Sequence, residues 1–232
     1  MADSLQFKSL DPIVRPSVAD QVFDTIYEQV LSVEMPPGTK ISEAEIARHL
    51  GVSRQPVRDA FFRLSQLGFL VIRPQKATTV SLISARDIFR ARFVRTALEV
   101  ETARRACRDL SQSDLNALQV LLEKQKQAVD AGDRSRFHAL DDEFHQLICE
   151  QLGFGFCWDV IREKKAHTDR VRFLSLAFAS QTALDDHHAI FDAICAKDEM
   201  KAEAAVREHL GRIESIIAHL REENHSWFAE ED

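Results

Sequence analysis

The chain has 232 residues, of which 45% are hydrophobic and 29% charged, with only 7 glycines and 6 prolines. This composition excludes a disordered chain, a collagen-like repeat and a loop-rich all-β sandwich. No apolar run approaches the roughly 18 residues of a membrane span, the first residues do not resemble a signal peptide, and the four cysteines lack a CxxC or disulfide-framework spacing. We therefore expect a cytoplasmic, mainly α-helical protein with reduced thiols.

The formal net charge of −7 argues against a nucleic-acid partner, but the charge is unevenly distributed. Residues 1–84 hold 9 basic and 9 acidic side chains, so the remainder carries the whole −7. Within residues 48–76 six side chains are basic and one is acidic, a local charge of +5. A basic stretch on an acidic protein is typical of a surface that binds phosphates, although a solvated helix face has a similar composition.

In chain order, residues 1–16 are predicted to be a mobile arm. A helix follows over about residues 18–31, where apolar side chains recur at helical spacing. It ends before Met35–Gly38, because a Pro-Pro-Gly turn cannot continue a helix.

Two short helices with a tight connection come next. Ser42 and Glu45 have the spacing of a capping box that opens the first helix, and Gly51 closes it. Ser53 is a second N-cap candidate, and the second helix is predicted to run from there to about Leu67. Two β-rich runs then predict a hairpin, so that the whole forms a winged helix-turn-helix.

The second of these helices has two distinct faces. Val57, Phe61 and Leu64 recur at i, i+4 and i+7 and are expected to face the core. The polar side chains at its N-terminal end are Arg54, Gln55 and Arg58. This is the part of a recognition helix that meets base edges, and arginine suits the guanine O6 and N7 atoms.

Residues 17–82 resemble the DNA-binding domain of GntR-type transcription regulators. The resemblance rests on the run Leu50–Ala60, on the Pro37–Thr39 turn before it and on the hairpin after it. It implies that the DNA-binding residues are Arg54, Gln55 and Arg58 on the helix and Lys76 on the hairpin, in the minor groove. The chain departs from the family pattern at Gln55, where threonine is usual, and at the hairpin tip, which lacks the usual glycine.

From Ser84 onward the sequence is helical throughout, and caps and glycines divide it into about six helices. The predicted caps are Ser84, Ser111, Asp133 and Thr182, and the predicted breaks are Gly132, Gly153 and Gly155. The predicted fold is therefore mainly α, with four parts. These are an arm at 1–16, a winged helix-turn-helix at 17–83, an all-α helical bundle at 84–223 and a tail at 224–232.

Four side chains of the helical half have the spacing of a metal site. Asp141 and His145 stand at i, i+4 on one predicted helix, so both can contact one ion. His187 begins the apolar face of a later helix, and His209 lies on the last long helix. The four are candidate ligands of Zn²⁺, Ni²⁺ or Mn²⁺. The alternative is that His145, His187 and His209 are ordinary surface or core histidines.

The helical half also resembles the FCD ligand-binding domain of the FadR branch of GntR regulators, over most of residues 84–220. The matching stretches are Arg95–Glu99, Leu140–His145, His187–Ile194 and Arg207–Leu210. The resemblance implies a divalent metal held by Asp141, His145, His187 and His209, with His187 favoured over the adjacent His188. It also implies a small organic or sugar acid as the effector.

A metal ion with an open coordination position would accept a carboxylate, and buried arginines could complete such a site. The candidate effector-binding residues are Arg95, Arg170 and Arg172. Each arginine also has an explanation that involves no effector. Arg95 can form an i, i+4 ion pair with Glu99, and Arg170 and Arg172 can be solvated.

The sequence thus predicts a DNA-binding transcription regulator, which we expect to be a repressor and not an enzyme. It would bind double-stranded DNA as a homodimer on a two-fold operator and sense a small carboxylate through the metal site. Two alternatives remain. One is a helical metal-dependent hydrolase, which leaves the winged helix-turn-helix unexplained. The other is a regulator whose helical domain only dimerises.

Overall fold

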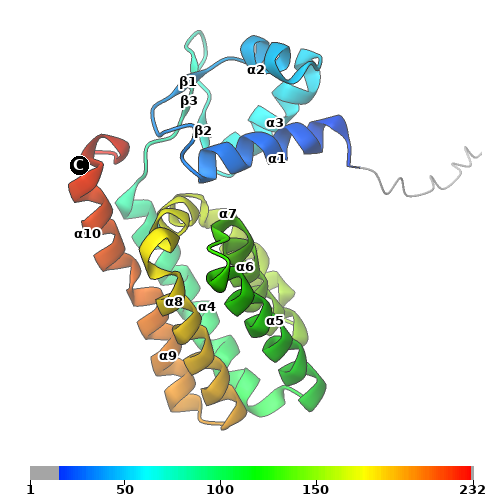
Figure 1. The fold of residues 1–232 in the computed structure, drawn as a ribbon, viewed down its shortest axis with the longest axis vertical. Helices are drawn as coiled ribbons and strands as arrows, with labels where there is room; N and C mark the ends of the chain where they lie inside the picture. Colours follow the sequence, from blue (N-terminus) through cyan, green and yellow to red (C-terminus); the bar gives the residue numbers. More distant parts are fainter. Residues whose placement is uncertain (1–15, 231–232) are drawn as a thin grey trace, which may run out of the picture.

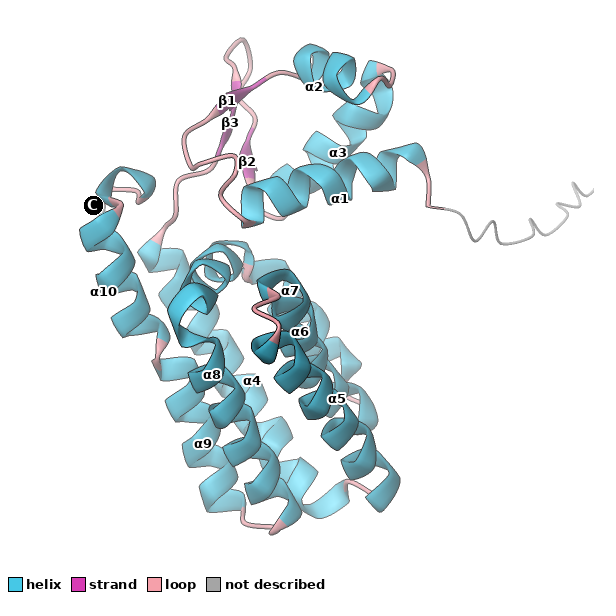
Figure 2. Cartoon of the chain, in the orientation of Figure 1, coloured by secondary structure: helices cyan, strands magenta, loops and turns pink. Residues whose placement is uncertain are grey.

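A computed structural model of the chain describes residues 16–230. A small N-terminal domain lies at one end of a larger helical domain (Figure 1), and Figure 2 shows that strands occur only in the small domain among the described residues. The predicted mobile arm lies outside the described residues except for Pro16. The predicted mainly α class and the combination of a winged helix-turn-helix with a helical bundle are confirmed. Across residues 16–230, no helix has the length and apolar character needed to span a membrane.

The N-terminal domain combines three helices with a small sheet. Its elements are α1 (Val18–Leu31), β1 (Lys40–Ile41), α2 (Glu43–Leu50), α3 (Arg54–Gln66), β2 (Leu70–Val71) and β3 (Thr78–Val80). The strands are antiparallel in the order β1-β3-β2, with Lys40 opposite Thr79 and Leu70 opposite Val80. The sequence predicts the hairpin but not β1, because two residues are too few to show strand alternation.

Local signals define the helix-turn-helix. The Ser42 hydroxyl accepts a hydrogen bond from the Glu45 amide at 3.1 Å, and Gly51 ends α2 with a φ of 67° that glycine adopts without strain. Ser53 stands before α3, but its side chain makes no capping hydrogen bond. At the hairpin tip Gln75 has a φ of 58°, so this residue adopts the left-handed conformation that a glycine would take more easily.

The core of the small domain lies between α1 and α3. Val57, Phe61 and Leu64 are buried there, as their spacing predicts. Arg63 packs on the same side of α3, where its guanidinium pairs with Asp20 at 2.7 Å and lies over the Phe23 ring. This packing leaves the N-terminal end of α3 exposed.

The helical domain contains seven α-helices among the described residues, one more than the sequence predicts. They are α4 (Ala85–Asp109), α5 (Gln112–Asp130), α6 (Arg134–Gln151), α7 (Gly155–Lys164), α8 (Ala166–Cys195), α9 (Glu199–Gly211) and α10 (Ile213–Glu223), followed by the 3-10 turn η1 (His225–Trp227). Ser84, Ser111 and Asp133 cap their helices as predicted. The predicted start at Thr182 is wrong: Thr182 is an exposed residue inside α8, and the chain breaks instead at Lys197, where φ is 56°.

The segment predicted as a tail packs back onto the connection between the two domains. The Ile83 amide donates to the Trp227 carbonyl at 2.8 Å, and the Ala229 amide donates to the Ile83 carbonyl at 2.8 Å. Phe228 shares an apolar cluster with Ile83 and with Ile213 of α10. The short connection of residues 81–84 is therefore held by the C-terminal end of the chain.

Candidate metal centre and DNA-binding surface

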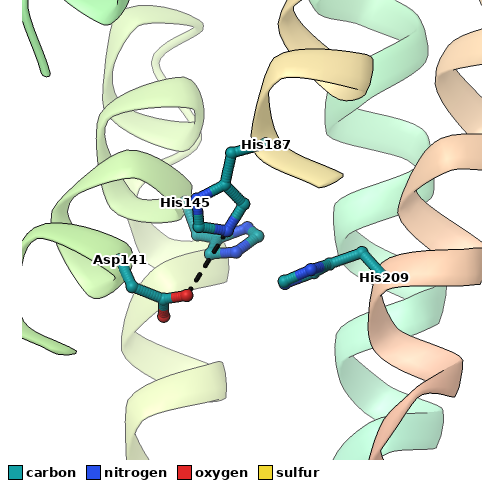
Figure 3. A group of neighbouring side chains, drawn as sticks. All are labelled: Asp141, His145, His187 and His209. Atoms are coloured by element: carbon teal, nitrogen blue, oxygen red, sulfur yellow. Dashed lines mark ion pairs between the residues drawn. The ribbon is translucent and has the colours of Figure 1, made fainter. Parts of the chain in front are cut away.

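The four predicted metal ligands converge inside the helical domain (Figure 3). Asp141 and His145 come from α6, His187 from α8 and His209 from α9. One ligand atom of each lies within 4.8 Å of the other three, and the four side chains are buried. His188, in contrast, is exposed and hydrogen-bonds to the backbone of its own helix. The structure therefore brings His187, and not its neighbour, to the site.

Each of the three rings has an oxygen atom from another helix beside its Nδ1 atom, and for His187 and His209 this contact is a hydrogen bond. The three contacts are His187 Nδ1 with Gln125 Oε1 at 2.8 Å, His145 Nδ1 with Glu99 Oε2 at 2.8 Å, and His209 Nδ1 with Asp186 Oδ2 at 3.4 Å. An acceptor at Nδ1 places the ring proton there and leaves the Nε2 lone pair for a metal. None of Gln125, Glu99 and Asp186 is predicted from the sequence to belong to the site. The polar Gln125 on the apolar face of α5 is a feature that could have pointed to one.

The inner side of the site presents lone pairs that lack partners. The Nε2 atoms of His145 and His187 are buried and have no hydrogen-bond partner in residues 16–230. His187 Nε2 also lies 3.3 Å from Asp141 Oδ1, so two lone pairs face each other. Unpaired buried polar atoms cost about 1–3 kcal/mol each. Three imidazole nitrogens and a carboxylate oxygen are a donor set that fits Zn²⁺, Ni²⁺ or Mn²⁺ and that such an ion would satisfy.

The protonation states also suit a metal ligand set. Burial, with neighbouring positive charge, holds the pKa of His187 well below 6.5. Burial likewise holds the pKa of His209 well below that value, although its Asp186 partner opposes the shift. Both rings are therefore neutral at pH 7, which is the form that binds metals.

A cavity with an interior volume of about 70 Å³ opens beside Asp141 and His209. Arg95 and Arg172 line it: Arg172 forms an ion pair with Asp141, and Arg95 Nε donates to Glu99 at 2.6 Å. Burial and the positive charge of Arg95 lower the pKa of Arg172 to about 9, so Arg172 stays charged at neutral pH. Because one water needs roughly 10–15 Å³ of such space, the cavity has room for a small anion.

Arg170, the third predicted effector residue, lies elsewhere. Its side chain is 0% exposed and does not line the cavity. The guanidinium donates to the Ser81 carbonyl at 2.5 Å, to the Ser81 hydroxyl at 3.1 Å, to the Leu82 carbonyl at 3.4 Å and to His167 Nδ1 at 2.9 Å. Arg170 therefore connects α8 to the residues that join the two domains.

The His167 contact predicts a pH dependence of stability. Burial and the charge of Arg170 lower the pKa of His167 to about 4, below the ordinary 6.5. As the pH falls, His167 is protonated in the unfolded chain before it is protonated in the folded chain. The contribution of neutral His167 to the free energy of unfolding is therefore complete above pH 6.5 and is lost as the pH falls toward 4. Urea unfolding should show a loss of about 2 kcal/mol across this range that the His167→Gln variant lacks. An identical pH profile in the variant would contradict the assignment.

The predicted DNA-binding residues are exposed in the small domain. Arg54, Gln55 and Arg58 lie at the N-terminal end of α3, and Lys76 lies at the hairpin tip. Arg58 pairs with Glu43 of α2 at 3.2 Å. Gln55 Nε2 donates to the carboxylate of Asp59, one turn later on α3. These partners orient the side chains at the surface while leaving them accessible.

Comparison with known proteins supports this architecture. The chain matches the family of bacterial regulatory proteins of the gntR type over residues 18–80 and the FCD domain over residues 87–212. It is 35% identical to the HTH-type transcriptional repressor RspR of Escherichia coli strain K12, over 92% of this chain and 95% of that protein. It is 30% identical to a probable D-xylose utilization operon transcriptional repressor of Paenarthrobacter nicotinovorans, over 89% of this chain and 92% of that protein.

Solved structures agree on the fold. E. coli McbR/YncC superposes with a TM-score of 0.72 at 24% identity, covering 89% of this chain and 99% of that one. A putative GntR regulator from Rhodococcus sp. RHA1 superposes with a TM-score of 0.71 at 19% identity, covering 86% of this chain and 97% of that one. The family matches and the relatives, together with the helix-turn-helix and the helical bundle described above, show that the chain is a transcription regulator of the GntR family with an FCD domain, and not an enzyme.

Proposed function

We propose that this regulator senses a small carboxylate through a divalent metal ion in its helical domain. The observation that carries the proposal is the arrangement of His145, His187 and His209. Each ring has a buried oxygen atom beside its Nδ1 atom, and the three rings meet around the carboxylate of Asp141. A site whose histidine rings are contacted by residues of α4, α5 and α8 is typical of a metal centre in which surrounding residues orient the ligands.

The arginines beside the metal site support a carboxylate as the effector. Arg95 Nη2 and Arg172 Nη1 are buried without a hydrogen-bond partner in the described part of the chain, and both residues line the cavity. Two guanidinium groups next to a cation favour an anion, and a carboxylate matches the paired donors of arginine. The relatives RspR and the D-xylose regulator are named as repressors. We infer that this chain represses transcription as well.

A thermal-shift experiment tests the sensor function. The full chain would be loaded with Zn²⁺, Ni²⁺ or Mn²⁺ and titrated with short carboxylic and sugar acids, before and after chelation. We expect a rise in the melting temperature that depends on both the acid and the metal. A metal-loaded chain whose melting temperature no acid changes would instead favour a helical domain that only dimerises around a structural ion.

The DNA-binding surface gives a prediction with two separable results. Arg54→Ala should weaken binding to a selected operator by about 1–3 kcal/mol and relax the preference at one base pair. Lys76→Ala should weaken binding to all sequences and reduce the salt slope by about 1. Fluorescence anisotropy with labelled duplexes at several salt concentrations measures both. The control is Lys201→Ala, which changes an exposed side chain on the helical domain. If Arg54→Ala bound the operator with the same affinity as Lys201→Ala, the assignment of Arg54 to the DNA-binding surface would be contradicted.

We infer that two copies of the chain pair through the outer face of α4. Phe93 is 76% exposed there, and Phe89 one turn earlier is 42% exposed beside a groove lined by Ala97 and Val100. Exposed aromatic side chains at helical spacing favour an isologous helix pair, and a two-fold operator needs two copies.

Phe93→Asp should convert a dimer into a monomer in light scattering at micromolar concentration. The change Phe156→Asp on α7 should leave the dimer intact, and a dimeric Phe93→Asp chain would contradict this interface.

A further inference from the structure

The helix α3 carries a single acidic side chain on its exposed surface. Asp59 is the only acidic residue within residues 48–76, where six side chains are basic. It is exposed and forms no ion pair within residues 16–230, and Arg58 and Arg63 of the same helix pair instead with carboxylates of α2 and α1. A carboxylate on a surface that binds phosphates weakens that attraction, so Asp59 has a cost unless it contributes to DNA binding in another way.

This carboxylate determines how the amide of Gln55 is oriented. Gln55 Nε2 donates to Asp59 Oδ1 at 2.9 Å, across one turn of α3. An ionised carboxylate only accepts hydrogen bonds, so the Nε2 end of the amide must face Asp59 and the Oε1 end must point away from it. Because Gln55 is exposed, its amide presents two groups at the surface of the helix: the acceptor Oε1 and the second N–H of Nε2.

An acceptor beside a donor matches the major-groove edge of adenine. Adenine presents the donor N6 next to the acceptor N7, and a glutamine amide can contact both atoms. Guanine presents the acceptors O6 and N7 instead, so Oε1 would face another lone pair. If the carboxylate were absent, the amide could turn over and donate both of its N–H groups to guanine. Asp59 excludes the turned orientation and with it the favourable contact to guanine.

We propose that Gln55 contacts an adenine in the major groove of the operator and that Asp59 is the positioning residue that makes this contact selective. This inference rests on the assignment of the N-terminal end of α3 to the DNA-binding surface, and it adds the base that Gln55 selects. The cost of a carboxylate near the phosphates is then offset by discrimination between adenine and guanine at one base pair.

Fluorescence anisotropy of the full chain on an operator selected from random duplexes tests the proposal. Each base pair of the site is replaced in turn, and the pair at which Gln55→Ala loses the wild-type preference identifies the contact of Gln55. At this pair the wild-type chain should bind adenine roughly tenfold more tightly than guanine, and Gln55→Ala should bind the two about equally. An adenine analogue with carbon in place of N7 should weaken binding of the wild-type chain by about threefold or more and leave binding of Gln55→Ala unchanged.

The variants of Asp59 test the positioning role. In Asp59→Asn the new amide can accept from Gln55 or donate to it, so the adenine preference should fall to about threefold or less, whereas Asp59→Glu keeps a carboxylate and should keep the preference. Asp24→Asn removes the same charge from an exposed position on α1 and should also keep it.

Two results would overturn the inference and leave the DNA-binding surface intact. One is an Asp59→Asn chain that keeps the wild-type preference, as expected if the pair only stabilises α3. The other is a Gln55-dependent base pair at which adenine is not preferred. If Arg54→Ala and Gln55→Ala both bound every duplex as the wild type does, the placement of α3 at the base edges would be overturned, and the inference with it.

Discussion

The His187→Gln variant is expected to bind a divalent metal about 100-fold more weakly than the wild-type chain, or worse. The change removes the Nε2 ligand atom from the centre of the site, where His187 is 0% exposed and faces the carboxylate of Asp141 at 3.3 Å. A glutamine amide keeps the volume and polarity of the ring but is a poor ligand for Zn²⁺ or Ni²⁺. Competition with a chromophoric chelator measures the affinity, and mass spectrometry of the digested protein measures the metal content.

The adjacent histidine provides a matched control for this variant. His188→Gln changes the same residue type on the same helix, one position later, where the side chain is exposed and hydrogen-bonds to the α8 backbone. It should bind metal as the wild type does. Circular dichroism of both metal-free variants should show the same helix content. Equal metal affinity in the two variants would refute the ligand set, whereas a loss confined to His187→Gln supports it.

Arg170→Met is expected to lower the free energy of unfolding by about 3 kcal/mol. The variant preserves the apolar stem but removes a buried cation that donates to the carbonyls of Ser81 and Leu82 and to the ring of His167. Hydrogen bonds from charged groups contribute about 1.5–3 kcal/mol, and the carbonyls left behind stay buried. Urea unfolding followed by circular dichroism measures the loss. Arg162→Met, at a side chain that is 63% exposed, should stay within about 0.5 kcal/mol of wild type.

The same variant tests how the two domains communicate. Arg170 lies two residues from Arg172, which contacts Asp141, and it holds the backbone that follows β3. The connection is also held by Trp227 and Ala229 after α10. We expect Arg170→Met to retain its metal, because no ligand changes, while the effect of an acid on DNA affinity is lost. An unchanged acid response in the variant would mean that the signal does not pass through this contact.

Local sequence features predicted much of the fold because they act over a few residues. The caps at Ser84, Ser111 and Asp133 each bond to a backbone amide three residues later, so their effect is visible in the sequence. The predicted start at Thr182 failed because a threonine that can cap a helix is also tolerated inside one, exposed on its surface. The strand β1 is too short to show a pattern and depends on pairing with β3.

The site shows the same division between local and long-range information. Asp141 and His145 share a helix face, which their spacing reveals, whereas the Nδ1 acceptors Gln125 and Asp186 reach the rings only through packing of separate helices. Sequence proximity also grouped Arg170 with Arg172. The structure separates them because side chains two residues apart on a helix point in different directions, one to the connection and one to the cavity.

Metal content is the measurement that tests the metal centre most directly. The full chain, prepared without a histidine tag, would be stripped by a chelator, dialysed against Zn²⁺, Ni²⁺ or Mn²⁺ in turn and analysed by elemental mass spectrometry. The arrangement of Asp141, His145, His187 and His209 predicts about one tightly held ion per chain for at least one of these metals. A folded chain that retains none of the three would contradict the metal centre and the acid sensing that depends on it.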